Sequence, residues 1–325
     1  MTKKKSDYDF IKESIEKSIE RAKELQKIDP DVFDEYDDHS LLKLICIQYW
    51  IGFFTPIVAK HFQSRGKPMI FVDSMAGSGI TKTKKGISLC GSSPGALISA
   101  NDKKHPFDYL VSVEIDDNKA STLEKRLDKI KNNTKVYVIH NDIKNVSQDL
   151  KDKLKKSIAF TLIDPQAFKG ISWDSISPLL CTRGDIMVSW FEWELWRMRC
   201  SALSDTNPSS ANATMGRITN LLGNEDWKNE DDPEELTNIF IKRVLNECQK
   251  EHAEVFKIKR VSGGNYFKMI LFTNNKAKKA AMKWKANMER RLSHMNYDAL
   301  STLLDVGEGK MISLDQYTDE STIPQ

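Results

Sequence analysis

From residue 68 onward, short apolar runs alternate with longer stretches of helical periodicity. The runs are continuously apolar, which is typical of strands that are covered by helices on both faces. They occupy residues 69–73, 109–114, 135–139, 158–163 and 185–190. The helical stretches occupy residues 94–101, 117–131, 146–155 and 173–180, and the first has Ser93 as its expected N-cap. This order predicts a parallel sheet with right-handed crossovers, an α/β fold of the Rossmann type.

The end of this pattern indicates a β-hairpin. Residues 255–261 and 266–272 are rich in apolar side chains, and Gly263 and Gly264 lie in the short turn between them. A helix is expected before the hairpin, over residues 233–249. We therefore predict about seven strands, of which only 266–272 runs antiparallel to the others.

The N-terminal region, residues 1–66, has a different pattern of apolar and polar residues. A polar helix is expected over residues 7–26, an acidic connector over 29–38, and an apolar helix over 41–62 with a kink near Pro56. Charged and polar residues interrupt the apolar helix, so we interpret it as a buried helix rather than a membrane span. The predicted organisation is an N-terminal helical region (1–66), a Rossmann-like domain (67–295) with a polar insertion (200–233), and a C-terminal tail (296–325).

Composition places the chain among globular proteins, with 40% hydrophobic and 29% charged residues. The lysines at the N-terminus are not followed by an apolar segment, so no secretory signal is expected. The five cysteines form no CxxC pair and no Cys/His cluster, which argues against a zinc or iron–sulfur site. Reduced, buried thiols and a cytoplasmic location, with no membrane association, fit this pattern best.

The charge is unevenly distributed, although the net charge is only +3. Residues 251–291 contain eleven Lys or Arg against three acids, whereas residues 224–235 contain seven acids and one lysine. A basic face of this kind can bind a nucleic acid. The alternative is a solvated basic helix with no ligand.

The first strand is followed by a glycine loop. Asp73 ends the strand, and Ala76, Gly77 and Gly79 follow it in the sequence DSMAGSG. Glycines permit close backbone approach, and the acid can receive a ligand ammonium group. The third glycine of a dinucleotide fingerprint is replaced by Lys82, which favours a cofactor without a pyrophosphate. A simple tight turn is the alternative.

Two further acids end the next strands. Glu114 can accept both hydroxyls of a ribose, and Ile115 beside it can lie against an adenine face. Asp142, after the third strand, can accept a hydrogen bond from the adenine amino group. Together with Asp73, these acids form one constellation at three strand ends, and the cofactor that they predict is S-adenosylmethionine.

The fourth and fifth strands lead to candidate substrate residues. Asp164 and Gln166, in the sequence DPQAF, lie where a methyl group would be delivered and can orient an amino group. After the fifth strand, Trp190, Trp193 and Arg197 can stack and hold a nucleobase. The alternative is that these aromatic residues pack a lid onto the core.

These motifs together resemble the three-Cys-motif partner family. The similarity runs through DSMAGSG, GSSPGALISA, VSVEIDD, DPQAF and YFKMILFTNNKAKKAAMKWKANM, over roughly residues 40–295. The resemblance implies a class I methyltransferase fold and a protein partner with three cysteines, similar to radical-SAM proteins. We therefore expect a methyltransferase, and the basic segment 251–291 together with the Trp/Arg cluster favours a nucleic acid as its substrate. A non-catalytic partner subunit and a small-molecule methyltransferase are the alternatives.

Overall fold

The computed structural model describes residues 7–36, 40–62, 66–168, 171–259, 266–292, 302–305 and 307–309. Its helices are α1 (Asp7–Gln26), α2 (Ser40–His61), α3 (Ser92–Asp102), α4 (Asp117–Ile130), α5 (Ile143–Leu154), α6 (Trp173–Leu180), α7 (Glu192–Ser204), α8 (Pro208–Leu222), α9 (Pro233–Glu247) and α10 (Lys278–Leu292). Its strands are β1 (Asp34–Tyr36), β2 (Met69–Asp73), β3 (Ile80–Thr83), β4 (Ser88–Cys90), β5 (Tyr109–Glu114), β6 (Lys135–His140), β7 (Ile158–Ile163), β8 (Gly184–Trp190), β9 (His252–Lys259) and β10 (Tyr266–Thr273).

The main sheet has seven strands in the order β6-β5-β2-β7-β8-β10-β9. Strand β10 pairs antiparallel with both β8 and β9, and the other pairings in this sheet are parallel. This confirms the predicted α/β fold with a Rossmann-like, mostly parallel sheet that ends in antiparallel pairings. The predicted turn at Gly263 and Gly264 lies outside the described residues.

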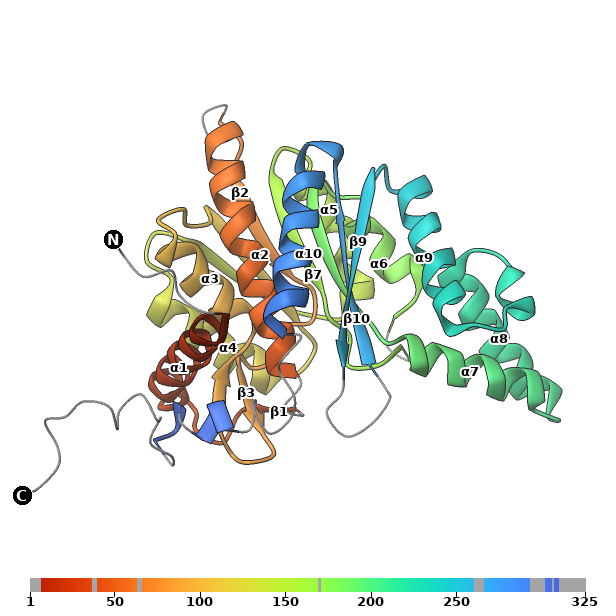
Figure 1. Ribbon diagram of the computed structural model, residues 1–325, viewed down its shortest axis with the longest axis horizontal. Helices are drawn as coiled ribbons and strands as arrows, with labels where there is room; N and C mark the ends of the chain where they lie inside the picture. The colour runs from red at the N-terminus through yellow and green to blue at the C-terminus, as the bar shows by residue number, and fades with distance from the viewer. Residues whose placement is uncertain are drawn as a thin grey trace, which may run out of the picture.

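Alternate strand residues enter two separate cores, because successive side chains of a strand point to opposite faces. On one face Phe71 and Phe160 pack with α2 and α10, including Trp50 and Trp284. On the other face, the neighbouring strand residues pack with α5, α6, α8 and α9. The sheet therefore lies between two helical layers (Figure 1).

Helix α2 is part of the first core rather than an appendage. By length and composition Leu41–His61 could cross a membrane, but 67% of its most apolar window is buried inside the protein. Helix α1 packs on the same core through Ile11, Ile15 and Ile19, each no more than 1% exposed. The sequence prediction of a buried apolar helix is confirmed, and Pro56 lies inside the continuous helix.

Two regions differ from the sequence prediction. The segment after Gly79 forms the hairpin of β3 and β4, which joins β1 in a separate three-stranded sheet. The polar insertion at 200–233 is largely helical, with α8 and a 3-10 turn at Asp226–Asn229. Trp227 in that turn is fully buried and belongs to the second core, so the insertion packs onto the main domain.

A disulfide joins Cys181, after α6, to Cys248, after α9. The sequence analysis expected reduced thiols, and for this pair that expectation is wrong. Spacing could not reveal the pairing, because the two cysteines lie 67 residues apart. The predicted cytoplasmic location stays a prediction.

Reducing this disulfide should lower the free energy of unfolding by about 4 kcal/mol, since the cross-link closes a long loop in the unfolded chain. Urea denaturation with and without reductant measures the change. Cys200→Ser, at an exposed thiol, is the control and should leave the stability unchanged. Equal stability of the oxidised and reduced proteins, or a mass that shows no disulfide, would contradict this prediction.

Candidate cofactor and acceptor site

The predicted acids meet at one edge of the main sheet. Asp73 is the last residue of β2, and Glu114 is the last residue of β5. Asp142 lies two residues after the end of β6, and Asp164 directly follows β7. The strand order reverses between β2 and β7, and ligands of open α/β sheets bind outside the carboxyl ends of the strands at such a point. Asp73 and Asp164 flank this switch point.

Asp73 is completely buried, and its Oδ2 accepts hydrogen bonds from the hydroxyls of Ser92 and Ser93. Ser93 is therefore not the N-cap of α3 as predicted; the cap is Gly91. Burial, together with the nearby charge of Asp164, raises the pKa of Asp73 to about 6. Asp73 Oδ1 is buried and accepts no hydrogen bond from the described part of the chain.

The glycine loop is shaped by close contacts with other elements. Gly77 and Gly79 have φ angles of 64° and 84°, a conformation that favours glycine. A Cβ on Gly77 would collide with the Asp34 carboxylate, and one on Gly79 would lie 2.7 Å from Leu123. Asp34 also accepts a 2.7 Å hydrogen bond from the Ser78 amide. The loop backbone thus needs its glycines, as predicted, although the group that approaches here is a protein side chain.

Glu114 is fixed in place by backbone amides. Its Oε2 accepts from Gly77 N at 2.7 Å, and its Oε1 accepts from Asp116 N at 2.9 Å. A carboxylate has about four acceptor positions, so each oxygen can accept a further hydrogen bond. The next side chain, Ile115, is 64% exposed, and Ala76 lies buried in the loop between β2 and β3.

Asp142 lies beside this position as the N-cap of α5. Its Oδ1 accepts from Lys144 N at 3.0 Å, and its Oδ2 lies 3.0 Å from Lys144 Nζ. The carboxylate is 25% exposed. It can accept another hydrogen bond from solvent or a ligand, but part of its capacity serves the helix.

Asp164 forms a buried ion pair with a residue that sequence analysis did not single out. Lys43 Nζ, from the first turn of α2, lies 2.6 Å from Asp164 Oδ2, and both side chains are less than 10% exposed. Asp164 Oδ1 is buried and accepts no hydrogen bond from the described residues. A cavity of about 20 Å³ remains between Lys43, Asp164, Ser92 and Asp34, so Lys43 fills most of the space beside the switch point. Gln166 is exposed.

The predicted substrate residues do not form one surface. Trp190 is fully buried, donates a 3.0 Å hydrogen bond to Thr237 Oγ1 and stacks on Phe240. Its burial assigns it to packing and does not agree with the predicted role in base stacking. Trp193 is half-buried and Arg197 is exposed on α7, which starts at the carboxyl end of β8.

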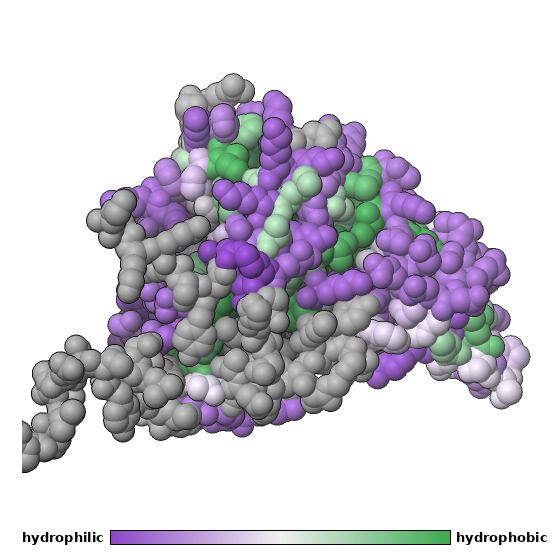
Figure 2. Space-filling model, in the orientation of Figure 1, coloured by the Kyte–Doolittle hydropathy of each residue, from purple (hydrophilic) through white to green (hydrophobic). Residues whose placement is uncertain are grey.

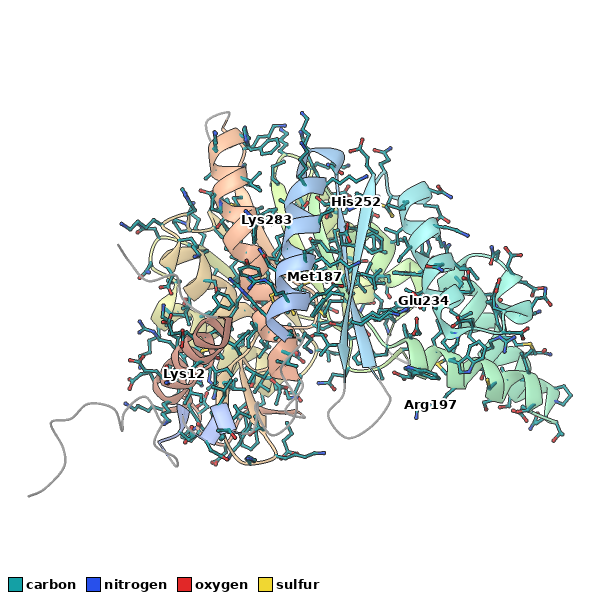
Figure 3. All side chains as sticks on the ribbon, in the orientation of Figure 1. Lys12, Met187, Arg197, Glu234, His252 and Lys283 are labelled. Carbon is teal, nitrogen blue, oxygen red and sulfur yellow. A yellow bond between two sulfur atoms is a disulfide. The ribbon has the colours of Figure 1, made fainter. Side chains whose placement is uncertain are left out.

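The basic C-terminal helix begins at the opposite edge of the sheet. Lys276, just before α10, lines a cavity together with Ile158 and Gly184, which are the first residues of β7 and β8. The start of this helix therefore lies away from the carboxyl ends of the strands, where the candidate cofactor residues are. Figure 3 shows Lys283 on α10 and Arg197 on α7 in separate parts of this face.

Asp34, Lys43 and Ser92 are the site residues that the sequence analysis missed. Asp34 lies in what was interpreted as an acidic connector, and Lys43 was considered only as an interruption of an apolar helix. The one usable signal was the pair of serines directly before Pro94, because two hydroxyls near a buried acid can both donate to it. Their partner in the fold could not be known from spacing alone.

No family model matches the chain, and no curated protein matches it. Among solved structures, the bifunctional kinase-methyltransferase WbdD is similar with a TM-score of 0.37 and 10% identity, over 72% of this chain and 39% of WbdD. M. jannaschii TYW2 in complex with AdoMet has a TM-score of 0.33 and 13% identity, over 63% of this chain and 67% of TYW2. TrmN from Thermus thermophilus has a TM-score of 0.33 and 12% identity, over 64% of this chain and 44% of TrmN. The fold assignment rests on the strand order and register described above.

The buried charge of Asp73 should make stability depend on pH. Unfolded Asp73 ionises near its ordinary value of 3.8, and the folded protein holds the proton up to about pH 6. The folded state therefore binds more protons in this window, and wild-type stability falls as pH rises through it. The full effect is about 3 kcal/mol.

Asp73→Asn has no such charge, so its stability relative to wild type should increase by that amount between pH 4 and pH 7. Urea denaturation across this pH range measures the difference. Asp149→Asn, at an exposed acid on α5, is the matched control and should show a nearly constant difference. A constant difference for Asp73→Asn as well would show that its carboxyl titrates normally.

Proposed function

We propose that this chain is a methyltransferase that uses S-adenosylmethionine. The observation that carries the proposal is the chemistry of three neighbouring strand ends. They place a buried carboxylate with an unused oxygen on β2, a backbone-held carboxylate beside an exposed Ile115 on β5, and a partly exposed Asp142 after β6. These groups match an ammonium group, a ribose diol, an adenine face and an adenine amino group, respectively.

The groups at the end of β5 support a role in binding the nucleoside part of the cofactor. Glu114 is oriented by Gly77 and Asp116, and Ile115 offers an apolar surface of the size that stacks on a base. Asp73 would accept hydrogen bonds from the ammonium group at the amino-acid end of the cofactor. The neighbouring Asp164 already has a positive partner, the Lys43 ammonium. When bound, S-adenosylmethionine supplies an electrophilic methyl group to a nucleophilic acceptor.

Asp164 is the residue that we propose for orienting the acceptor. Its Oδ2 is neutralised by Lys43, which leaves Oδ1 as the atom able to accept a proton or hydrogen bond from an acceptor amino group. Gln166, two residues later and exposed, can contribute an amide to the same acceptor. Buried serines and Lys43 restrict water at this edge.

A nucleic acid is the acceptor class that we propose. The support is Arg197, exposed on α7, with Trp193 on the preceding turn, since an arginine and an aromatic ring on one helix can hold a phosphate and a base. Lys82 and Lys84, in the hairpin of β3 and β4, add positive charge near the glycine loop.

A second candidate is a non-catalytic partner of a three-Cys-motif protein, as the family resemblance implies. The specific observation in its favour is the Lys43–Asp164 ion pair, which occupies the position where a methyl acceptor would be oriented. Incubation with labelled S-adenosylmethionine and mixed DNA, RNA and protein distinguishes the two: labelled product supports the enzyme. Cofactor binding without any product supports the partner subunit.

Glu114→Ala should weaken the binding of S-adenosylmethionine by about one to two orders of magnitude, because two charge-assisted hydrogen bonds to the ribose are lost. Titration calorimetry with both proteins measures the loss. Glu124→Ala, at an exposed acid on α4, is the control and should bind like wild type. Wild-type protein without detectable binding would refute the enzyme proposal itself.

Nucleic-acid affinity should fall steeply with salt, and Arg197→Glu should reduce the salt slope by about one. Lys279→Glu, on α10 near the opposite edge, should leave the slope unchanged. Trp193→Ala should weaken binding without loss of cooperative folding. Affinity too weak to measure at low salt would end the nucleic-acid proposal, and a reduced slope only for Lys279→Glu would move the interface to α10.

A further inference from the structure

A second cavity lies at the amino ends of β7 and β8, on the edge opposite to Asp73, Glu114 and Asp164. It has a volume of about 640 Å³, within the range of small-molecule sites. Ile158 and Gly184 begin the two strands at its base, and Thr273 ends the antiparallel β10 beside them. The cavity therefore does not overlap the proposed cofactor site.

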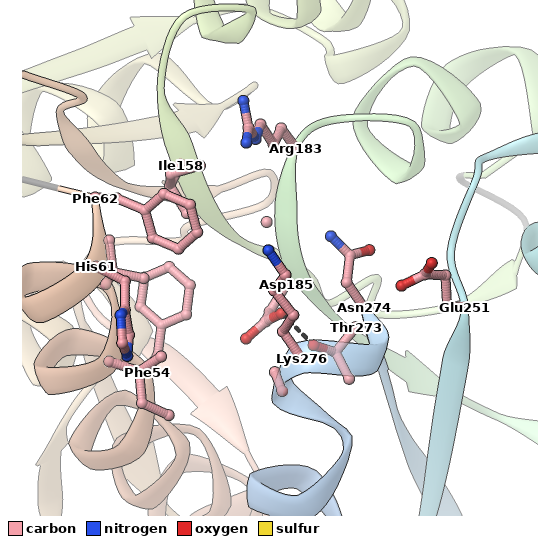
Figure 4. A pocket seen from close by; sticks show the side chains of 14 residues that line it. Phe54, His61, Phe62, Ile158, Arg183, Asp185, Glu251, Thr273, Asn274 and Lys276 are labelled. Atoms are coloured by element: carbon pink, nitrogen blue, oxygen red, sulfur yellow. Dashed lines mark hydrogen bonds between the residues drawn. The ribbon is translucent and has the colours of Figure 1, made fainter. Parts of the chain in front are cut away.

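One side of this cavity is apolar. The last two turns of α2 contribute Phe54 and Val58, Phe62 directly follows the helix, and Ile158 extends the wall from β7 (Figure 4). Phe54 and Val58 are 2% and 3% exposed, so they are held firmly by the core behind them. A wall of this kind fits an aromatic or aliphatic body.

The other side is polar and carries positive charge. Arg183, His61 and Lys276 are exposed residues of the lining, and they come from three different segments of the chain. Glu251 is the exposed acid of the lining, so basic residues outnumber it there. The Arg183 guanidinium lies 5.8 Å from the centre of the Phe62 ring, which places a cation directly beside the apolar wall. Guanidinium groups bind carboxylate, sulfonate and phosphate groups with two parallel hydrogen bonds.

The acid on the floor of the cavity already has partners. Asp185 is buried, and its Oδ1 accepts from Thr273 Oγ1 at 2.5 Å, the bond drawn in Figure 4. The positive charge of Lys250 acts on Asp185. The Lys250 ammonium is held in place by hydrogen bonds to the carbonyl oxygens of Thr182 and Gly184. Burial raises the pKa of Asp185 to about 6, so this acid is still largely ionised at neutral pH, and the nearby Lys250 ammonium offsets its charge toward an anionic ligand.

We propose that this cavity binds a small amphipathic anion, with an aromatic or aliphatic body against Phe54, Val58 and Phe62 and one acidic group held by Arg183 and Lys276. The juxtaposition of a rigid apolar wall with an exposed arginine and an exposed lysine in the lining of one cavity carries the inference. It does not depend on the proposed methyltransferase activity.

The test uses the full chain and two matched fluorescent probes, 8-anilinonaphthalene-1-sulfonate and its neutral relative N-phenyl-1-naphthylamine. The sulfonate should bind saturably at one site per chain, and saturating S-adenosylmethionine should not displace it. The variant with Arg183→Gln and Lys276→Gln together should bind the sulfonate at least about tenfold more weakly. The same variant should bind the neutral probe as wild type does.

Two further variants make the result specific. Lys279→Gln removes an exposed lysine of α10 outside the lining and should leave both affinities unchanged. Ala277→Trp puts a large ring into the lining and should abolish the binding of both probes while the cooperative thermal transition is kept. Sulfonate binding that is absent, insensitive to Arg183 and Lys276, or displaced by S-adenosylmethionine would overturn the proposal.

Discussion

The buried carboxylate of Asp73 is the constraint on which the arrangement of this protein depends. A charge at the centre of a sheet is costly unless it is hydrogen-bonded, and two serine hydroxyls of α3 supply those bonds. They tie the end of β2 to the first turn of α3 and so place the loop between them. That loop in turn donates an amide from Gly77 to Glu114, which fixes the end of β5. One buried acid thus determines the relative positions of three elements at the candidate site.

Helix α2 connects the two edges of the sheet. Its first turn places Lys43 at Asp164, and Val58 in its last turn, with Phe62 directly after it, lines the cavity at the amino ends of the strands. Between them, Trp50 and Phe54 lock the helix into the core with Trp284 and Phe160. Because the helix is held along its length, both of its ends have fixed positions. This explains how a segment outside the alternating part of the chain contributes to both candidate sites.

The strands and most helices of the main sheet could be predicted, because continuous apolar runs and helical periodicity are local properties of the sequence. The errors arise where a distant partner decides. Ser93 has the sequence environment of an N-cap, but its hydroxyl donates to Asp73, twenty positions away. Its neighbour Ser92 donates to the same carboxylate. Trp190 ends β8, at the position where a ligand-stacking ring is expected, yet Phe240 and Thr237 pack against it. The short strands β3 and β4 carry lysines and a glycine turn, so their pattern did not stand out from a solvated loop.

The charge distribution also depends on contacts between residues that are distant in the sequence. Several basic residues of segment 251–291 are paired with acids: Lys257 lies 3.1 Å from Glu234, Lys285 lies 3.5 Å from Glu254, and Lys268 is buried against Glu192. Glu234 belongs to the acidic segment 224–235, so part of the two opposite excesses cancels inside the fold. Hydrophilic side chains still cover much of α9 and α10 in Figure 2, but as a mixed surface. A local excess of lysine in the sequence therefore does not by itself create a basic surface, because the fold brings acids beside several of these lysines.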